Sequence, residues 1–249
     1  MIKFFRKIRQ NLLMENKTGK YFKYAIGEIL LVVIGILIAL QINNWNNNRI
    51  AKKQLKEIYK QIQTDLKVDT TNIAQIVKLY DEKDKRIQNI IDRKIKSSFY
   101  DTLNSINYKD CKICISESTN YNGFNPTTKG YDLLKKTIVV RGISSDSLPD
   151  KIESFYTNGV PRLETNLLNI KNITSENIKT NEQYSWFVDW VEKKYNKDFL
   201  TYIFESQSYR NQLARYRIYY KGNYIRNLKY YRELSIEILE LLEMELNKK

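Results

Sequence analysis

The sequence contains no histidine among its 249 residues. Imidazole is the usual general base near neutral pH and a common metal ligand, so this absence excludes histidine-based catalytic triads and histidine metal sites. Cysteine is almost as scarce, because Cys111 and Cys114 are the only two and cannot fill the four positions of a structural zinc site. The motifs GxxxxGK[ST], GxGxxG and GxSxG are also missing. We therefore expect a protein that is not an enzyme and that needs no cofactor.

Charge is abundant and unbalanced. The chain has 42 Lys and Arg against 28 Asp and Glu, a net charge of +14, which favours contact with something anionic such as lipid head groups, surface polysaccharide or nucleic acid. Charged residues make up 28% of the chain, as in soluble globular proteins, so any membrane segment must be local. The remaining length of roughly 200 residues suffices for one domain with a buried core.

One apolar run stands out near the N-terminus. Residues 25–42 are apolar or glycine at every position except Glu28 and Gln41, which is about the length that a helix needs to cross the hydrocarbon of a bilayer. Tyr24 before the run and Trp45 after it suit the two aromatic belts of a membrane helix. We expect a transmembrane helix over residues 25–45 that is an uncleaved anchor, because residues 40–43 offer no small-residue cleavage site.

The basic residues around this run indicate its orientation. More Lys and Arg precede the run than follow it, and this bias predicts a cytoplasmic N-terminus. Residues 1–24 should form a basic amphipathic segment lying on the anionic inner leaflet, because Ile2, Phe5, Ile8 and Leu12 recur at helical spacing. Residues 46–249 would then be a periplasmic helical domain. The preceding cations are Lys3, Arg6, Lys7, Arg9, Lys17, Lys20 and Lys23, and the following ones Arg49, Lys52, Lys53, Lys56 and Lys60.

The opening MIKFFRKIRQNLLMENKTGKYFKYAIGEILLVVIGILIALQINNWN resembles the signature of an uncharacterised family of single-pass membrane proteins from Gram-negative bacteria, known only as a domain of unknown function. GFNPTTKGYDLL from Gly123 and LPDKIESFY from Leu148 resemble a weaker second region of that family. The resemblance implies anchoring in the inner, cytoplasmic membrane. It brings no activity and no catalytic residues.

Helical periodicity dominates the rest of the chain. Apolar residues follow a 3,4 spacing from Leu55 to Ile90, which predicts a long helix over about residues 48–95, with a kink or break at residues 69–72. Shorter helices are expected at about 128–136, 147–156, 160–178 and 184–194, and a second long helix at 206–246. The fold class predicted is all-α: one transmembrane helix, then an antiparallel helical bundle built on the two long helices. A weak strand pattern, KTIVVRG at 136–142, is the exception.

Five residues are candidates for special roles. Cys111 and Cys114 form a CxxC that favours a structural disulfide or inert thiols, with an intermolecular metal or disulfide link or redox chemistry as alternatives. Gly27 and Gly35 lie on roughly one face of the membrane helix, where small residues permit close packing of a second helix; the alternative is that glycine is simply tolerated in a membrane helix. Glu28 is either a snorkelling residue near the interface or a polar contact to such a partner.

The function expected is a membrane-anchored helical interaction module, sensor-like or scaffolding, with the bilayer and a protein partner or a second copy as its partners. The alternatives are an envelope enzyme using carboxylates or the CxxC, and a basic polyanion-binding protein. Nucleic acid is disfavoured because Tyr216, Tyr220, Tyr224, Leu228 and Tyr231 form one helical stripe typical of a core, with the neighbouring cations mostly off it.

Overall fold

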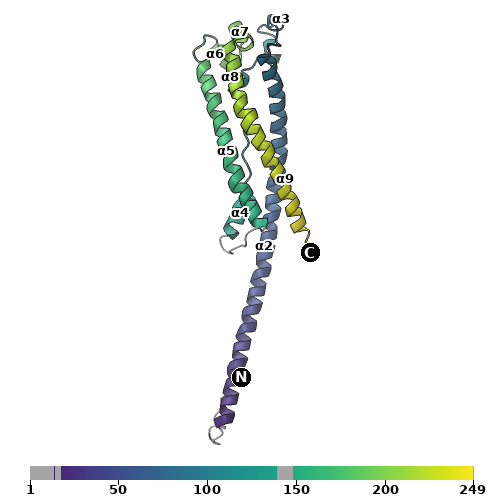
Figure 1. Ribbon diagram of the computed structural model, residues 1–249, viewed down its shortest axis with the longest axis vertical. Coiled ribbons are helices and arrows are strands. Elements are labelled where there is room, and N and C mark those ends of the chain that lie inside the picture. Colours follow the sequence, from purple (N-terminus) through teal and green to yellow (C-terminus); the bar gives the residue numbers. More distant parts are fainter. Residues whose placement is uncertain (1–13, 15–17, 139–147, 249) are drawn as a thin grey trace. The chain divides into compact units, whose positions relative to one another are not determined.

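A computed structural model describes residue 14 and residues 18–138 and 148–248 (Figure 1), and the described part is helical with no β-strand. The chain divides into two compact units at the bond between Glu57 and Ile58. The elements, in order, are α2 (Thr18–Ile91), α3 (Ser97–Tyr100), η1 (Tyr108–Asp110), η2 (Glu117–Thr119), α4 (Lys129–Ile138), α5 (Leu148–Asn181), α6 (Phe187–Val191), α7 (Lys197–Glu205), α8 (Gln207–Arg217), η3 (Ile218–Ile225) and α9 (Arg226–Leu246).

The N-terminal unit contains the apolar run. From Ala25 the helix α2 is long and apolar enough to span a membrane, and none of its most apolar stretch is buried within the protein. Leu31 and Leu37 are about 60% exposed, and exposed apolar side chains in such a continuous row require another apolar medium to cover them. The amphipathic segment expected over residues 1–24 lies largely outside the described residues.

The part of α2 in the second unit buries the predicted apolar stripe, including Tyr59, Ile62, Leu66, Ile73 and Ile87. Of the kink or break expected at residues 69–72, the break is wrong, because α2 continues unbroken to Ile91. The polar residues there do not compete with the helix: the hydroxyls of Thr70 and Thr71 donate to the Lys67 carbonyl oxygen at 3.0 and 2.9 Å. The Asp69 carboxylate instead accepts hydrogen bonds from Thr127, which is far from it in the sequence.

Both α2 and α6 end in the same backbone turn. Arg93 and Lys193 have left-handed φ angles of 56° and 57°, and the next residue in each case bonds back across the turn. The Lys94 N–H donates to the Asn89 carbonyl and the Lys194 N–H to the Asp189 carbonyl. This pattern is a Schellman motif, which satisfies carbonyl groups that a helix end leaves unpaired.

The two helices expected at 147–156 and 160–178 form one helix, α5, with Pro161 inside it. Judged from the sequence alone, residues 159–161 suggest that the helix ends there, but Gly159 permits close packing instead. A Cβ atom on Gly159 would come within 3.0 Å of the Tyr231 ring, so the glycine lets α9 approach α5 closely. Residue 147, where the first of these helices was expected to begin, and most of the weak strand pattern at 136–142 lie outside the described residues, while Lys136 belongs to α4.

The C-terminal helix expected over about 206–246 is present as a continuous helical run of α8, η3 and α9, in which η3 is a π-helix of eight residues. Tyr216, Tyr220, Tyr224 and Leu228 follow one another at intervals of four, which is longer than the α-helical repeat of 3.6. The wider turn of a π-helix keeps such a series on one face. All four side chains are buried, as are Tyr209, Leu213 and Tyr231.

The helix α7 was not expected from sequence. It begins at Asn196, whose side chain accepts a hydrogen bond from the Phe199 N–H at 3.2 Å, and the capped helix buries Phe199, Leu200 and Ile203. In the second unit, α5 packs against η3 and α9, and α4 packs against α5. Hydrogen bonds from α2 to the C-terminal run include those between Lys83 and Tyr216 and between Arg232 and Thr70.

Candidate functional site: an apolar groove between α5 and α9

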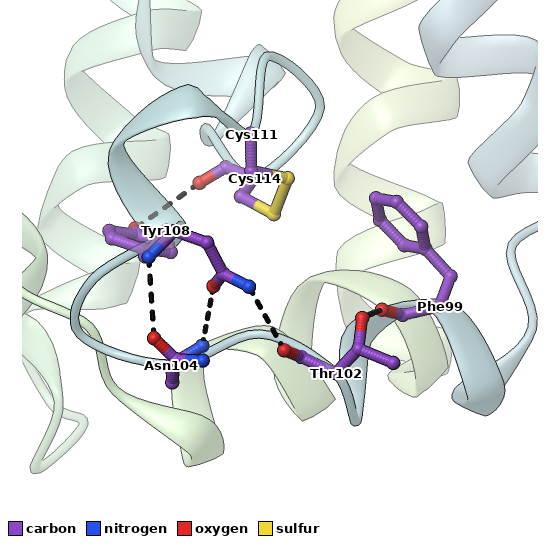
Figure 2. Close-up of a disulfide and its surroundings, with 7 residues drawn as sticks. Phe99, Thr102, Asn104, Tyr108, Cys111 and Cys114 are labelled. Carbon is purple, nitrogen blue, oxygen red and sulfur yellow. Dashed lines mark hydrogen bonds between the residues drawn. A yellow bond between two sulfur atoms is a disulfide. The ribbon is translucent and has the colours of Figure 1, made fainter.

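The two cysteines are joined in a disulfide just after η1 (Figure 2), with their Cα atoms 5.3 Å apart. The surrounding turn is held by the chain itself: the Tyr108 hydroxyl donates to the Cys114 carbonyl oxygen at 3.3 Å, and the Asn107 amide to the Thr102 carbonyl oxygen at 3.1 Å. Cys114 is buried and Cys111 is partly exposed. The arrangement suits a small staple within this segment.

The three candidates in the apolar run lie on α2. A Cβ atom on Gly27 or Gly35 would meet no neighbouring atom within 4 Å, so nothing in the described part of the chain packs closely against either glycine. Glu28 lies beside Gly27 and is partly exposed. Packing of a second membrane helix on this face stays a prediction.

A strip of buried polar residues on α2 was not recognised as a unit in the sequence. The Asp65 carboxylate accepts from the Gly130 N–H at 2.6 Å, and Asp69 accepts from the N–H and the hydroxyl of Thr127 at 3.0 and 2.8 Å. The Tyr80 hydroxyl accepts from the Asn122 N–H at 3.1 Å. These bonds hold the segment between η2 and α4, which runs in the opposite direction to α2.

Lys83 is the most unusual member of this strip, because its side chain is only 4% exposed. Its ammonium group donates to the carbonyl oxygen of Asn120 at 2.6 Å, to the Asn120 Oδ1 at 2.7 Å and to the Tyr216 hydroxyl at 3.1 Å. Burial lowers the pKa of Lys83 to about 7, although the nearby Glu117 carboxylate acts in the opposite direction. Glu117 is itself fully buried and forms an ion pair with Arg86.

The polar strip is therefore saturated by the protein. An ammonium group has three donors, and all three of Lys83 bind atoms of this chain. Such a group has none left for a substrate or ligand. The strip explains the residues Asp69 and Lys83 that interrupt the apolar stripe of α2, and its role is to fix the segment that crosses it.

The cations of the C-terminal run are partly engaged as well. Arg217 binds the Asp84 carboxylate through Nε and Nη2 at 2.8 and 3.0 Å, and Lys221 binds the same carboxylate at 2.6 Å. Arg232 donates to the Thr70 carbonyl oxygen at 3.2 Å. The C-terminal run is thus tied to α2 by Arg217 at the end of α8, Lys221 in η3 and Arg232 in α9, whereas Arg226 and Lys229 are exposed. Of these five cations, Lys221, Arg226 and Lys229 are exposed and Arg217 and Arg232 are partly exposed, so none of them belongs to the buried Tyr stripe.

A groove with a volume of about 610 Å³ lies between α5 and α9. Its floor is made by the buried side chains of Phe155, Leu163, Tyr231 and Ile238. The Phe155 and Tyr231 rings pack with their centroids 4.6 Å apart. Mostly apolar linings with a few polar groups, and volumes of this size, are typical of binding sites.

The two walls of the groove differ in character. The α5 wall carries the exposed side chains Lys151, Ser154, Asn158 and Arg162, which recur at helical spacing. The α9 wall is largely apolar and includes Leu234, Leu241 and Tyr230, of which Tyr230 is 49% exposed. Glu237 is the one acidic residue among the groove's lining residues in the described part of the chain.

Sequence reasoning missed this groove because it divided α5 at residues 159–161. The Tyr stripe was recognised as core, but the partner surface across from Tyr231 lies on both sides of Gly159. An unbroken helix over residues 151–163 would have placed the four polar residues of the α5 wall on one face. That series was the available signal.

The fold and the groove can now be set beside known proteins. No curated protein and no solved structure matches the chain. A family of unknown function, DUF6090, matches residues 28–171, which begin within the apolar run of α2 and extend into α5. Both regions of resemblance after residue 122 fall within that range. Since the match covers more than half of the sequence, the chain belongs to the family DUF6090.

Proposed function

We propose that this protein is a membrane-anchored helical interaction module whose groove between α5 and α9 binds a protein partner. The groove carries the proposal, because it is an open apolar surface of the second unit with a volume of about 610 Å³ and a polar wall along one side. The long helices α2 and α8–α9 form the frame of an antiparallel bundle in this reading, which presents α5 and α9 together.

The proposed topology is a single pass through the inner membrane of a Gram-negative bacterium. Residues 1–24 lie on the cytoplasmic leaflet, residues 25–45 cross the bilayer and residues 46–249 form the periplasmic domain. The excess of Lys and Arg before the run supports this orientation. The disulfide between Cys111 and Cys114 is compatible with an oxidising compartment.

Binding rather than catalysis is supported by how the buried polar groups are used. Lys83 and Glu117, two of the buried charged groups, bind atoms of the chain itself. A polyanion-binding role is weakened in the same way, because Arg217 and Lys221 are paired with Asp84. We therefore propose neither an enzyme nor a nucleic-acid binder.

The anchor and orientation are tested in a Gram-negative host. Membranes are washed with alkaline carbonate, and a reporter that is active only in the periplasm is fused after Lys249. The protein should stay in the membrane fraction and the reporter should be active. Release by carbonate would refute the anchor, and a reporter active only in the cytoplasm would refute the orientation.

The groove is tested by placing a photo-cross-linking amino acid at Tyr230, on its α9 wall, in the full chain. The control carries the same amino acid at Ile218, which is 64% exposed and is not among the groove's lining residues. A discrete protein adduct should form at position 230 and not at 218. Equal labelling at both positions, or lipid adducts alone at 230, would contradict a protein-binding groove.

A further inference from the structure

The groove has a length and a charge pattern that restrict its occupant. The lining residues of α9 run from Asn227 to Leu241, which is roughly 21 Å along a helix axis. Those of α5 run from Lys151 to Leu163, roughly 18 Å. An extended apolar object about three to four helical turns long would therefore fill it.

The two cations on the α5 wall lie far apart. Arg162 follows Lys151 by eleven residues, which is three turns and roughly 16 Å of helix. Both side chains are exposed, and the uncharged side chains of Ser154 and Asn158 lie between them on the same wall. An occupant complementary to this wall carries two negative charges separated by a similar distance, with hydrogen-bonding groups between them.

We infer that the groove binds an amphipathic α-helix of another protein, whose apolar stripe faces Phe155, Tyr231 and Ile238 and whose two carboxylates, about eleven residues apart, face Lys151 and Arg162. This inference rests on the function proposed above and specifies the partner. An amphipathic helix in a groove is a common mode of peptide recognition, with anchors at intervals of three and four residues.

The charge separation favours such a helix over an anionic lipid. A lipid concentrates its negative charge in one head group at one end of its acyl chains. Cations that served a head group would lie close together, but Lys151 and Arg162 are near opposite ends of the lining of α5. On a partner helix, residues eleven apart return to nearly the same face after three turns.

The test uses the full chain, one copy per nanodisc of zwitterionic lipid, and a fluorescent synthetic helix of about eighteen residues. The first peptide has a Leu stripe and two Glu residues eleven positions apart on one side of it. A second peptide carries Lys at these two positions, and a third carries both Glu residues within one turn. Binding is followed by fluorescence anisotropy at low and high salt.

Two variants with the same change in net charge distinguish binding at the groove from a general effect of charge on the protein. Lys151→Glu with Arg162→Glu reverses the groove wall, and Lys171→Glu with Lys179→Glu makes the same change in charge on exposed residues of α5 outside it. The first variant should bind the first peptide about tenfold more weakly and bind the Lys peptide better than the native chain does. The second should bind the first peptide as the native chain does.

Each result decides a different point. The inference is supported if the native chain binds the first peptide best and only the variant with Lys151→Glu and Arg162→Glu prefers the Lys peptide. If all three peptides bound equally and Leu234→Asp abolished this binding, the groove would still be a peptide-binding site. The proposed pairing of Lys151 and Arg162 with two carboxylates would then be wrong. Binding of phosphatidylglycerol vesicles in place of any peptide, lost in the groove variant, would make the occupant a lipid. Loss of peptide binding when two copies share a nanodisc would make it a second copy of the chain.

Discussion

Gly130 lies against the backbone of Ile62 so closely that a Cβ atom on it would come within 2.6 Å of the Ile62 nitrogen. This contact brings the Gly130 N–H to the Asp65 carboxylate at 2.6 Å, where α4 begins beside α2. Gly130→Ala should lower the free energy of unfolding by about 2–3 kcal/mol, because the helix backbone of α2 cannot move aside. Thermal unfolding followed by circular dichroism measures the change.

The matched control is Gly222→Ala in η3, where a Cβ atom would meet nothing within 4 Å. That substitution should be neutral or stabilising by about 0.5–1 kcal/mol, because alanine loses less conformational freedom than glycine in a helix. Equal effects at the two positions would contradict the close approach at Ile62.

The depressed pKa of Lys83 predicts a pH dependence of stability. Its folded value of about 7 lies below the ordinary value of 10.5, so the unfolded chain binds more protons between these two values. Stability should therefore rise with pH above about 7, by up to about 1.4 kcal/mol per pH unit, and this group should add almost no slope well below pH 7. Chemical denaturation at intervals from pH 6 to 9 tests the prediction.

Lys83→Met should remove this part of the slope, whereas Lys85→Met, at an exposed neighbour, should leave it in place. A slope that persists in Lys83→Met would assign the pH dependence to other groups.

The Tyr stripe offers a test of core against surface. Tyr224 is fully buried and its hydroxyl donates to the Asn122 carbonyl oxygen at 3.3 Å. Tyr224→Ala should cost about 3 kcal/mol as a lost buried aromatic, and Tyr224→Phe only about 1 kcal/mol as a lost hydrogen bond. Arg226→Ala and Lys229→Ala, at exposed positions, should be nearly silent. If Tyr224→Ala left the unfolding temperature unchanged while Arg226→Ala and Lys229→Ala lowered it, the assignment of the tyrosines to the core and of the cations to the surface would be reversed.

The anchor predicts a sharp response to charge at its centre. Ile34→Lys should release the protein from the membrane, because a cation at the bilayer centre costs about 3 kcal/mol on the insertion scale. Asn46→Lys, beyond the apolar run, should not. Carbonate extraction of both variants gives the comparison, and retention of Ile34→Lys would weaken the case for this segment as the sole anchor.

The disulfide should contribute little to stability, because its loop is short and constrains few conformations of the unfolded chain. Cys111→Ser with Cys114→Ser should fold with a loss of about 1 kcal/mol or less. In native membranes the thiols should resist alkylation until a reductant is added. Free thiols in unreduced membranes would show that the bond does not form in the cell.

Periodicity allowed the long helices and the buried tyrosines to be predicted, because both depend on local spacing along the chain. It failed at Asp69, where a polar residue in an apolar stripe suggests a break unless its partner, Thr127, is known. It failed again at Gly159, because a glycine next to a proline signals a turn, and only the position of Tyr231 shows that the glycine permits close packing. The groove depends on that contact, so the spacing of the polar residues on α5 could indicate it only if α5 was first predicted as one unbroken helix.

The segment from Glu117 to Gly130 has no regular structure for most of its length, yet side chains of α2 bind it at several points from one end to the other. Going down α2, Arg86, Lys83, Asp69 and Asp65 meet residues 117, 120, 127 and 130 in turn. Loops ordinarily tolerate insertions and deletions. Here one added residue in the middle would shift every later anchor out of alignment, so changes of length should be far less tolerated in this stretch than its irregular backbone suggests.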